Sequence, residues 1–192
     1  MPIQLTTERL LLRPLVQSDF EAVHTYASDP EVCHYMNFGP NTEEETRVFL
    51  RASAQGWAEE PPDNYEFAVT LRGNGDLIGT CGLHLGPFRR AEIGYIYRRE
   101  AWGQGYGTEA ARAVVDFGFR QLGLHRVQAR HDAPNVASGR IMQRLGMTCE
   151  GRFREAVYRD GEWHDVLLYG ILEEEWRAGS LPGPADHAHP GD

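Results

Sequence analysis

Three glycines alternate with larger residues in one short stretch, Gly103–Thr108 (GQGYGT). The stretch follows a run of alternating apolar residues typical of a strand and precedes a run typical of a helix. Glycine adopts backbone conformations that other residues avoid, so several backbone N–H groups can point together at the positive end of the helix dipole. Such an arrangement binds anions, and phosphate most naturally. This stretch, called the glycine turn below, therefore predicts a site for a phosphate-bearing ligand.

The glycine turn does not match the common nucleotide-binding loops. The chain has no G-x-x-x-x-G-K-[ST] motif, and the turn lacks the G-x-G-x-x-G spacing with an acidic residue after the next strand. A nucleotide-phosphate domain is disfavoured because no lysine or metal ligand accompanies the turn. The other interpretation of the residues alone is a strand-to-helix turn that binds nothing.

Composition limits the class of protein. The 192 residues suffice for one domain with a sizeable core, and the net charge of −9 argues against nucleic acid as a partner. The acidic balance leaves room for a cationic small molecule or a peptide amine. No signal segment and no apolar run near the ~18 residues of a membrane span is present, so we expect a soluble, cytoplasmic protein without a membrane partner.

The cysteines and the C-terminal residues carry no predicted chemistry. Cys33, Cys81 and Cys149 are widely spaced and form no CxxC pair, which favours a reducing compartment and inert thiols. The apolar periodicity ends at Trp176, so we predict one domain over residues 1–176 and a disordered tail over residues 177–192. Isolated histidines in such a tail more often bind nothing, and no metal site is predicted.

The first third of the chain shows one strand and several helix start signals. Residues 8–15 (ERLLLRPL) are predicted to form a strand. Residues 18–21 and 42–45 both have the spacing of a capping box, so a helix is expected to begin at each. Asp29-Pro30 between them restarts a helical turn. We therefore expect two helices between the first and second strands.

Strands and helices then alternate. Residues 65–71, 77–85 and 91–98 alternate apolar and polar side chains, which predicts three strands. The helix after the glycine turn and a short strand at 127–131 complete a βαβ unit with a parallel pair. A second helix starts at Asn135.

The C-terminal part of the domain predicts a hairpin. Asp160-Gly161 is a strong two-residue hairpin signal between residues 152–158 and 165–172. The last strand is apolar on both faces, so it should lie inside the sheet.

This order of elements resembles the GNAT superfamily of acetyl-coenzyme A dependent N-acetyltransferases, and within it the RimJ/RimL ribosomal-protein N-acetyltransferase type. The resemblance covers roughly Leu5 to Trp176. Six segments carry it: residues 7–13 (TERLLLR), 91–95 (AEIGY), 102–110 (WGQGYGTEA), 135–138 (NVAS), 145–147 (LGM) and 160–165 (DGEWHD). It implies an α/β (α+β) fold, a single domain whose mixed sheet of six to seven strands has flanking helices and a splayed cofactor site.

The resemblance implies that the glycine turn holds the pyrophosphate of acetyl-coenzyme A. The family signature [QR]-x-x-G-x-[GA] falls on residues 102–107, with Trp102 in place of the expected polar side chain. Binding is expected to survive because the family relies on backbone N–H groups. The groups implied here are those of Gln104, Gly105, Tyr106, Gly107 and Thr108.

Two further segments are implied to hold the pantetheine arm. The backbone from Ile96 to Arg98 would pair with it as a strand does, and Asn135 would hydrogen-bond it from the other side. The alternative for Asn135 is an ordinary helix N-cap, and the two roles can coexist.

Acetyl transfer from a thioester needs a neutral amine, a donor for the oxyanion and a proton for the departing thiolate. Glu92 matches the strand carboxylate that the histone-acetyltransferase branch uses as base, and it shares a strand face with Gly94 and Ile96. A backbone N–H near Ile96 could serve the oxyanion. The other interpretation of Glu92 is a surface glutamate.

Two positions depart from the pattern of the family. The tyrosine acid that many members place on the Asn-started helix is Met142 here, and Ser138 matches the serine that RimJ/RimL-type enzymes offer instead. The carboxylate assigned as base before the hairpin tyrosine is Val157. Ser138 could protonate the thiolate directly or through water, or it is a helix-surface serine.

Tyr158 and His164 lie on the hairpin that should border the acceptor, where substrate positioning is expected. The sequence thus predicts an N-acetyltransferase, a monomer or homodimer without a metal, that acts on a primary amine. The acceptor stays open between a protein N-terminus and a small molecule such as an antibiotic, polyamine or amino-acid analogue. A coenzyme A-binding sensor without catalysis is the alternative that Met142 and Val157 motivate.

Overall fold

The computed structural model describes residues 3–59, 62 and 64–179. The strands are β1 (Leu5–Thr6), β2 (Leu10–Pro14), β3 (Asn64–Leu71), β4 (Leu77–Gly86), β5 (Arg90–Tyr97), β6 (Arg126–Asp132), β7 (Thr148–Arg159) and β8 (Glu162–Leu172). The helices are α1 (Phe20–Ala27), α2 (Pro30–Cys33), α3 (Glu43–Ala58), α4 (Tyr106–Arg120), α5 (Val136–Arg144) and α6 (Glu173–Arg177). The strands form one sheet in the order β1-β2-β3-β4-β5-β6-β8-β7.

The sheet has eight strands where six to seven were predicted. The additional strand is β1, which pairs antiparallel with β2. Thr7 closes the turn between them, because its hydroxyl accepts from the backbone N–H of Leu10 at 3.0 Å and its own N–H donates to the Leu10 carbonyl at 2.9 Å. The predicted fold class, an α/β domain with a mixed sheet and flanking helices, is confirmed, and β8 lies inside the sheet as predicted.

The helix start signals were right at two places and wrong at one. Thr42 and Glu45 form the predicted capping box of α3. Asp29 caps α2, a separate short helix, so three helices rather than two precede β3. The predicted start at residue 18 is wrong, because Gln17–Asp19 forms a 3-10 turn before α1. The Asp19 carboxylate binds Arg13 and the backbone N–H of Val16 there.

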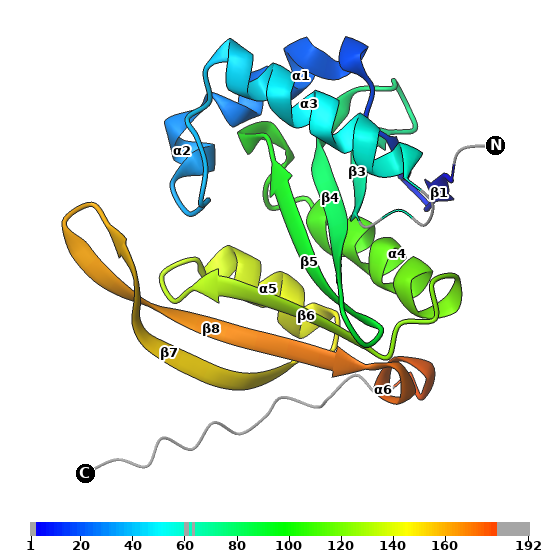
Figure 1. Ribbon diagram of the computed structural model, residues 1–192, viewed down its shortest axis with the longest axis vertical. Coiled ribbons are helices and arrows are strands. Elements are labelled where there is room, and N and C mark those ends of the chain that lie inside the picture. Colours follow the sequence, from blue (N-terminus) through cyan, green and yellow to red (C-terminus); the bar gives the residue numbers. More distant parts are fainter. Residues whose placement is uncertain (1–2, 60–61, 63, 180–192) are drawn as a thin grey trace.

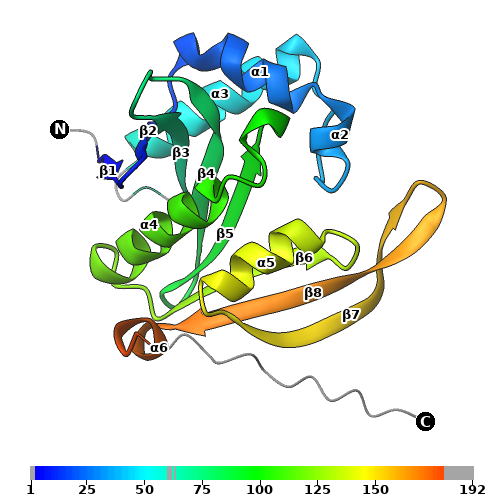
Figure 2. The ribbon, with the colours of Figure 1, turned by 180° about the vertical axis from the view of Figure 1, so that it is seen from behind.

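Helices cover both faces of the sheet, as the opposite views of Figure 1 and Figure 2 show. α1 and α3 contact β3 and β4 on one face, whereas α4 contacts β4 and β5 on the other. Successive side chains of β3 point to opposite faces of the sheet, so they belong to two different cores. Phe67 and Val69 belong to the core under α4, and Ala68 belongs to the core under α1 and α3.

The feature of the fold that matters most for function is the separation of β5 from β6. The two strands form the predicted parallel pair over only three register positions, which end at Glu92 opposite Gln128. Beyond this point β5 stays paired with β4 and β6 with β8, and the two strands diverge (Figure 1). We call this divergence the splay.

The C-terminal end of the described chain is α6, which ends one residue after the predicted domain boundary at 176. Residues 180–192 of the predicted tail lie outside the described residues. No helix in the described part of the chain is long and apolar enough to span a lipid bilayer.

Candidate active site

The glycine turn links the end of β5 to α4. Gly105 is the N-cap of α4 with φ +82°, and no side chain caps this end of the helix. The N–H of Glu109 donates to the Gly105 carbonyl at 3.1 Å, which closes the first helical turn. The N–H groups of Tyr106, Gly107 and Thr108 precede this bond, so no helical carbonyl lies four residues before them. The end of α4 therefore suits an anionic ligand.

The third glycine of the turn packs closely against α5 and β5. A Cβ atom at Gly107 would lie 2.9 Å from Cδ1 of Ile141 on α5 and 3.2 Å from Cε2 of Tyr97 on β5. A side chain at residue 107 would therefore require the Ile141 and Tyr97 side chains to shift.

Trp102 has a structural role that the sequence did not reveal. Its indole N–H donates to the carbonyl of Tyr97 at 2.8 Å, although the residue is 46% exposed. The side chain that replaces the expected polar residue thus ties the glycine turn to the last residue of β5.

A cavity of about 960 Å³ opens in the splay. Its walls come from the loop after α2 (residues 35–39), from β5 and β6, from α5, and from the β7–β8 hairpin. Four of the predicted site residues line it: Glu92, Asn135, Ser138 and Tyr158. His164 and the residues of the glycine turn are not part of its lining.

Glu92 lies at the vertex of the splay. Its Oε1 accepts from Nε of Arg130 at 2.8 Å, and its Oε2 accepts from Nε2 of Gln128 at 3.3 Å. The Glu92 side chain is 29% exposed. Because each carboxylate oxygen has two lone pairs, Glu92 keeps acceptor capacity beyond these two bonds.

Asn135 and Ser138 lie together at the start of α5. The Oδ1 of Asn135 accepts from the backbone N–H of Ser138 at 3.2 Å, so Asn135 is the N-cap of the helix. The Tyr95 hydroxyl from β5 donates to the Ser138 carbonyl at 3.1 Å and lies 2.9 Å from its Oγ. Burial raises the pKa of Tyr95, and the hydrogen bond with Ser138 only partly opposes this. The sequence did not predict Tyr95 as a partner of Ser138.

The main-chain N–H and C=O groups of β5 face β4 at one residue and the splay at the next. The N–H of Arg98 donates to the Ile78 carbonyl at 2.9 Å, on the β4 side. Because main-chain groups alternate along an antiparallel ladder, those of Ile96 also face β4, and those of Tyr95 and Tyr97 face the splay. Within the predicted segment from Ile96 to Arg98, Tyr97 is therefore the residue whose N–H faces the splay.

The hairpin and the loop after α2 are joined across the mouth of the cavity. Arg159 forms an ion pair with Asp132 and donates from Nη2 to the carbonyl of Met36 at 3.2 Å. Both ionic side chains are largely buried, at 17% and 10% exposure. This contact fixes the outer wall of the cavity, and no sequence pattern pointed to it.

The two predicted hairpin residues differ in position. Tyr158 is exposed and packs against Trp163 with ring centroids 5.1 Å apart. His164 lies opposite Val157 in the hairpin and is not part of the cavity lining, although Val157 is. The carboxylate next to it, Asp165, binds Arg152 and accepts from the N–H of Glu155 at 2.8 Å.

Comparison with known proteins identifies the family. A sequence model described as "Acetyltransferase (GNAT) domain" matches residues 9–148. The chain belongs to the GNAT acetyltransferase family. The uncharacterized N-acetyltransferase YnaD of Bacillus subtilis is 36% identical over 176 residues, which cover 91% of this chain and 99% of YnaD. A solved GNAT-family acetyltransferase from Bacillus anthracis has 36% identity and a TM-score of 0.80, covering 90% of this chain and 100% of that one.

More distant relatives have names that state an acceptor. Spermidine N(1)-acetyltransferase of Escherichia coli is 26% identical over 184 residues, which cover 94% of this chain and 91% of that protein. RimL, a ribosomal alpha-N-protein acetyltransferase solved in complex with coenzyme A, shares the fold with a TM-score of 0.80 at 20% identity, covering 88% of this chain and 98% of RimL. These comparisons assign the chain to the GNAT family and do not distinguish the predicted RimJ/RimL type within it.

This GNAT protein is an acetyl-coenzyme A dependent acetyltransferase. The residues present fit the acetyl donor, because the glycine turn offers uncapped helix N–H groups next to a splayed strand edge. Among the described residues, no group of three histidine, cysteine or acidic side chains could hold a metal ion.

Proposed function

We propose that this acetyltransferase transfers the acetyl group of acetyl-coenzyme A to a primary amine, and that the amine is a protein N-terminus. The observation that carries the proposal is the position of Glu92, a carboxylate at the vertex of the splay that lines a large cavity. A carboxylate there can attract an ammonium group and accept its proton, directly or through water.

The acetyl donor is proposed to bind along the open edge of β5. The backbone N–H groups of Gln104 to Thr108 would hold the pyrophosphate, and the N–H groups of Tyr95 and Tyr97 would face the pantetheine and the acetyl oxygen. Asn135 would contact the same arm from α5. On the side of β5 that faces β6, strand pairing ends at Glu92 among the described residues, which supports this placement.

The proposed chemistry uses direct transfer. Glu92 takes the proton of the ammonium, the new carbon–nitrogen bond forms, and the carbon–sulfur bond breaks. The Ser138 hydroxyl, held by Tyr95, would donate a proton to the departing thiolate, directly or through water. It would regain a proton from the reacting nitrogen, which loses its second proton as the amide forms. Donation by Tyr95 to the Ser138 carbonyl leaves the serine proton free to point elsewhere.

The charges that line the cavity favour a peptide over a polyamine. The carboxylates in the described lining are Glu92 and Asp132, and each is paired with an arginine, Arg130 and Arg159 respectively. A polyamine with several positive charges would need several carboxylates with free acceptor capacity, whereas a single N-terminal amine needs one, and Glu92 keeps such capacity beside Arg130. A volume of about 960 Å³ also lies at the upper end of small-molecule pockets.

The proposal can be tested with a panel of acceptors at fixed acetyl-coenzyme A. The panel contains peptides that begin with a small residue, the same peptides with a blocked N-terminus, and spermidine. We expect kcat/KM for the free peptides to exceed that for spermidine by roughly tenfold or more. Blocked peptides without lysine should give no turnover.

Other outcomes of this panel would contradict the proposal in different ways. Faster acetylation of spermidine than of any peptide would make the acceptor a small-molecule amine. Saturable acetyl-coenzyme A binding without turnover on any amine would indicate a coenzyme A-binding sensor. Absence of acetyl-coenzyme A binding would overturn the proposed cofactor site as well.

A further inference from the structure

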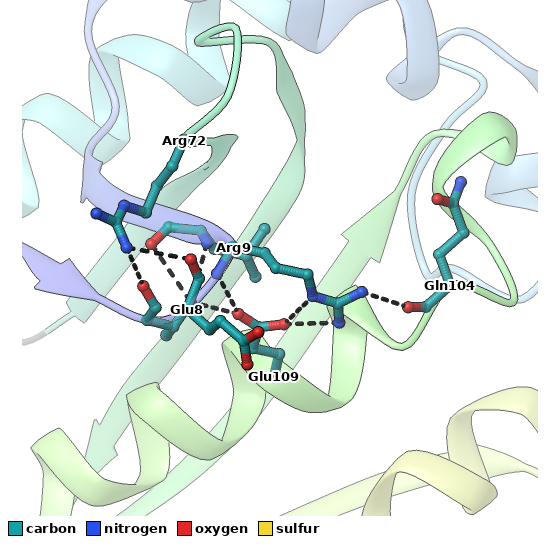
Figure 3. Close-up of polar contacts among 7 residues, drawn as sticks. Glu8, Arg9, Arg72, Gln104 and Glu109 are labelled. Atoms are coloured by element: carbon teal, nitrogen blue, oxygen red, sulfur yellow. Dashed lines mark hydrogen bonds and ion pairs between the residues drawn. The ribbon is translucent and has the colours of Figure 1, made fainter.

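An ion pair joins the N-terminal strands to the first turn of α4. Arg9 lies in the turn between β1 and β2, and its Nε and Nη2 bind Oε2 of Glu109 at 2.7 and 2.6 Å. The other carboxylate oxygen of Glu109 accepts from the Arg9 backbone N–H at 2.9 Å and from the Thr7 hydroxyl at 2.6 Å. Figure 3 shows the contacts between Arg9 and Glu109 at the start of α4.

The same guanidinium reaches the glycine turn. Arg9 Nη1 donates to the carbonyl of Gln104 at 3.0 Å (Figure 3). Its Cζ lies 4.5 Å from the centre of the Tyr106 ring, which is a cation–π distance. A Cβ atom at Gly105 would lie 3.4 Å from Nη2. Arg9 thus contacts or borders three consecutive residues of the turn from the outside.

The pairing also changes the charge at the end of α4. Glu109 is an acidic residue in the first turn of the helix that is proposed to bind pyrophosphate. Burial opposes ionisation of this carboxyl, but the hydrogen bonds from Thr7 and Arg9 outweigh it and lower its pKa. Without a partner, this negative charge would repel a phosphate. Arg9 neutralises the charge and holds the carboxylate away from the turn.

We infer that Arg9 is a positioning residue for the pyrophosphate of acetyl-coenzyme A, with Glu109 as its anchor. Arg9 holds the carbonyl of Gln104 outward, so that the N–H groups that follow are directed together toward the ligand. The inference rests on the proposed function, which puts the pyrophosphate at the glycine turn.

Arg72 provides a matched control. Its Nη1 donates to the carbonyls of Thr7 and Glu8 at 2.9 and 3.1 Å, so it stabilises the same N-terminal segment. None of these contacts reaches the glycine turn (Figure 3). A loss of coenzyme A binding that is specific to Arg9 therefore separates positioning of the turn from general support of the N-terminal strands.

The test compares the coenzyme A dissociation constants of wild-type protein, Arg9→Met and Arg72→Met by calorimetry. We expect Arg9→Met to weaken coenzyme A binding roughly tenfold or more, because it removes the contact with the glycine turn. Arg72→Met should weaken binding by less than about twofold, because Arg72 makes no such contact. Arg9→Lys should recover only part of the affinity, because an ammonium cannot bind Glu109 and Gln104 in the same fork geometry.

A second readout needs no ligand. Amide hydrogen exchange of Glu109, whose N–H donates to the Gly105 carbonyl, should be faster in free Arg9→Met than in free wild type and unchanged in Arg72→Met. Wild-type affinity in Arg9→Met, or equal losses in both variants, would overturn the inference alone. Absence of coenzyme A binding by wild type would overturn the proposed function and the inference with it.

Discussion

Glu92, Tyr95 and Ser138 come from two elements that meet only at the splay. Catalytic roles for Glu92 and Ser138 could be proposed from the motifs around them. The partners that hold them could not, since Arg130 and Tyr95 lie 38 and 43 residues away in sequence. Single-residue patterns reveal the capacity of a side chain for chemistry, whereas its orientation depends on contacts that only the fold creates.

Glu66 on β3 is an acidic residue whose surroundings favour the neutral form. Its Oε2 would clash with a Cβ atom at Gly82, so the carboxylate packs over a position where the neighbouring strand has no side chain. Burial raises the pKa of Glu66 to about 7, and a hydrogen bond with Thr80 only partly opposes the shift.

This shift predicts how stability depends on pH. The pKa of Glu66 is higher in the folded than in the unfolded protein, so its contribution is fully present below the unfolded value of 4.5 and is lost as pH rises through about 7. Glu66→Gln should therefore gain on the order of 2 kcal/mol in free energy of unfolding, relative to wild type, between pH 5 and pH 8. Urea unfolding at the two pH values measures this.

Glu45→Gln is the control for that experiment. Hydrogen bonds from the backbone and side chain of Thr42 lower the pKa of Glu45, so it stays ionised from pH 5 to pH 8 in both states. Its substitution should change stability by the same amount at both pH values. If the effect of Glu66→Gln on the free energy of unfolding were also the same at pH 5 and pH 8, the account of Glu66 would be refuted.

At the scale of elements, periodicity located most strands and helices, and the glycine turn was placed correctly between β5 and α4. The first residues of the helices were predicted less accurately, because neighbouring polar side chains can compete to cap the same backbone groups. The spacing at Ser18 and Glu21 matched a capping box, yet the Asp19 carboxylate is used by Arg13 and Val16 in a 3-10 turn instead. The support of the glycine turn by Arg9 could not be predicted, since 95 residues separate Arg9 from Gln104.

The glycine turn itself can be tested by two substitutions of equal backbone strain. Gly105 and Gly75 have φ of +82° and +80°, and Gly75 lies in the β3–β4 turn with no neighbour within 4 Å of an added Cβ. Gly105→Val should lose coenzyme A binding by at least roughly tenfold, because a side chain blocks approach to the backbone. Gly75→Val should lose about 1–2 kcal/mol of stability and keep its affinity.

Calorimetry with coenzyme A and urea unfolding together read out this comparison. Unchanged affinity in Gly105→Val would show that the pyrophosphate does not bind at the glycine turn. A similar loss of affinity in Gly75→Val would point to a general effect of backbone strain.

At the scale of the whole molecule, the resemblance predicted the fold class and the splayed sheet, and both agree with the structure. The walls of the cavity were less predictable. The outer wall depends on Arg159, which joins the hairpin to Met36 across 123 residues of sequence. In the proposed function this wall borders the acceptor, and because the wall depends on such distant contacts the sequence left the identity of the acceptor open.

The central claim is that the amine reacts at the vertex of the splay. The most direct test is kcat for coenzyme A release by Glu92→Gln with a peptide acceptor at saturating acetyl-coenzyme A. We predict a fall of roughly 100-fold or more, as expected for loss of a general base, with an unchanged dissociation constant for acetyl-coenzyme A. A kcat within about twofold of wild type would contradict the assignment of Glu92 and the reaction centre proposed here.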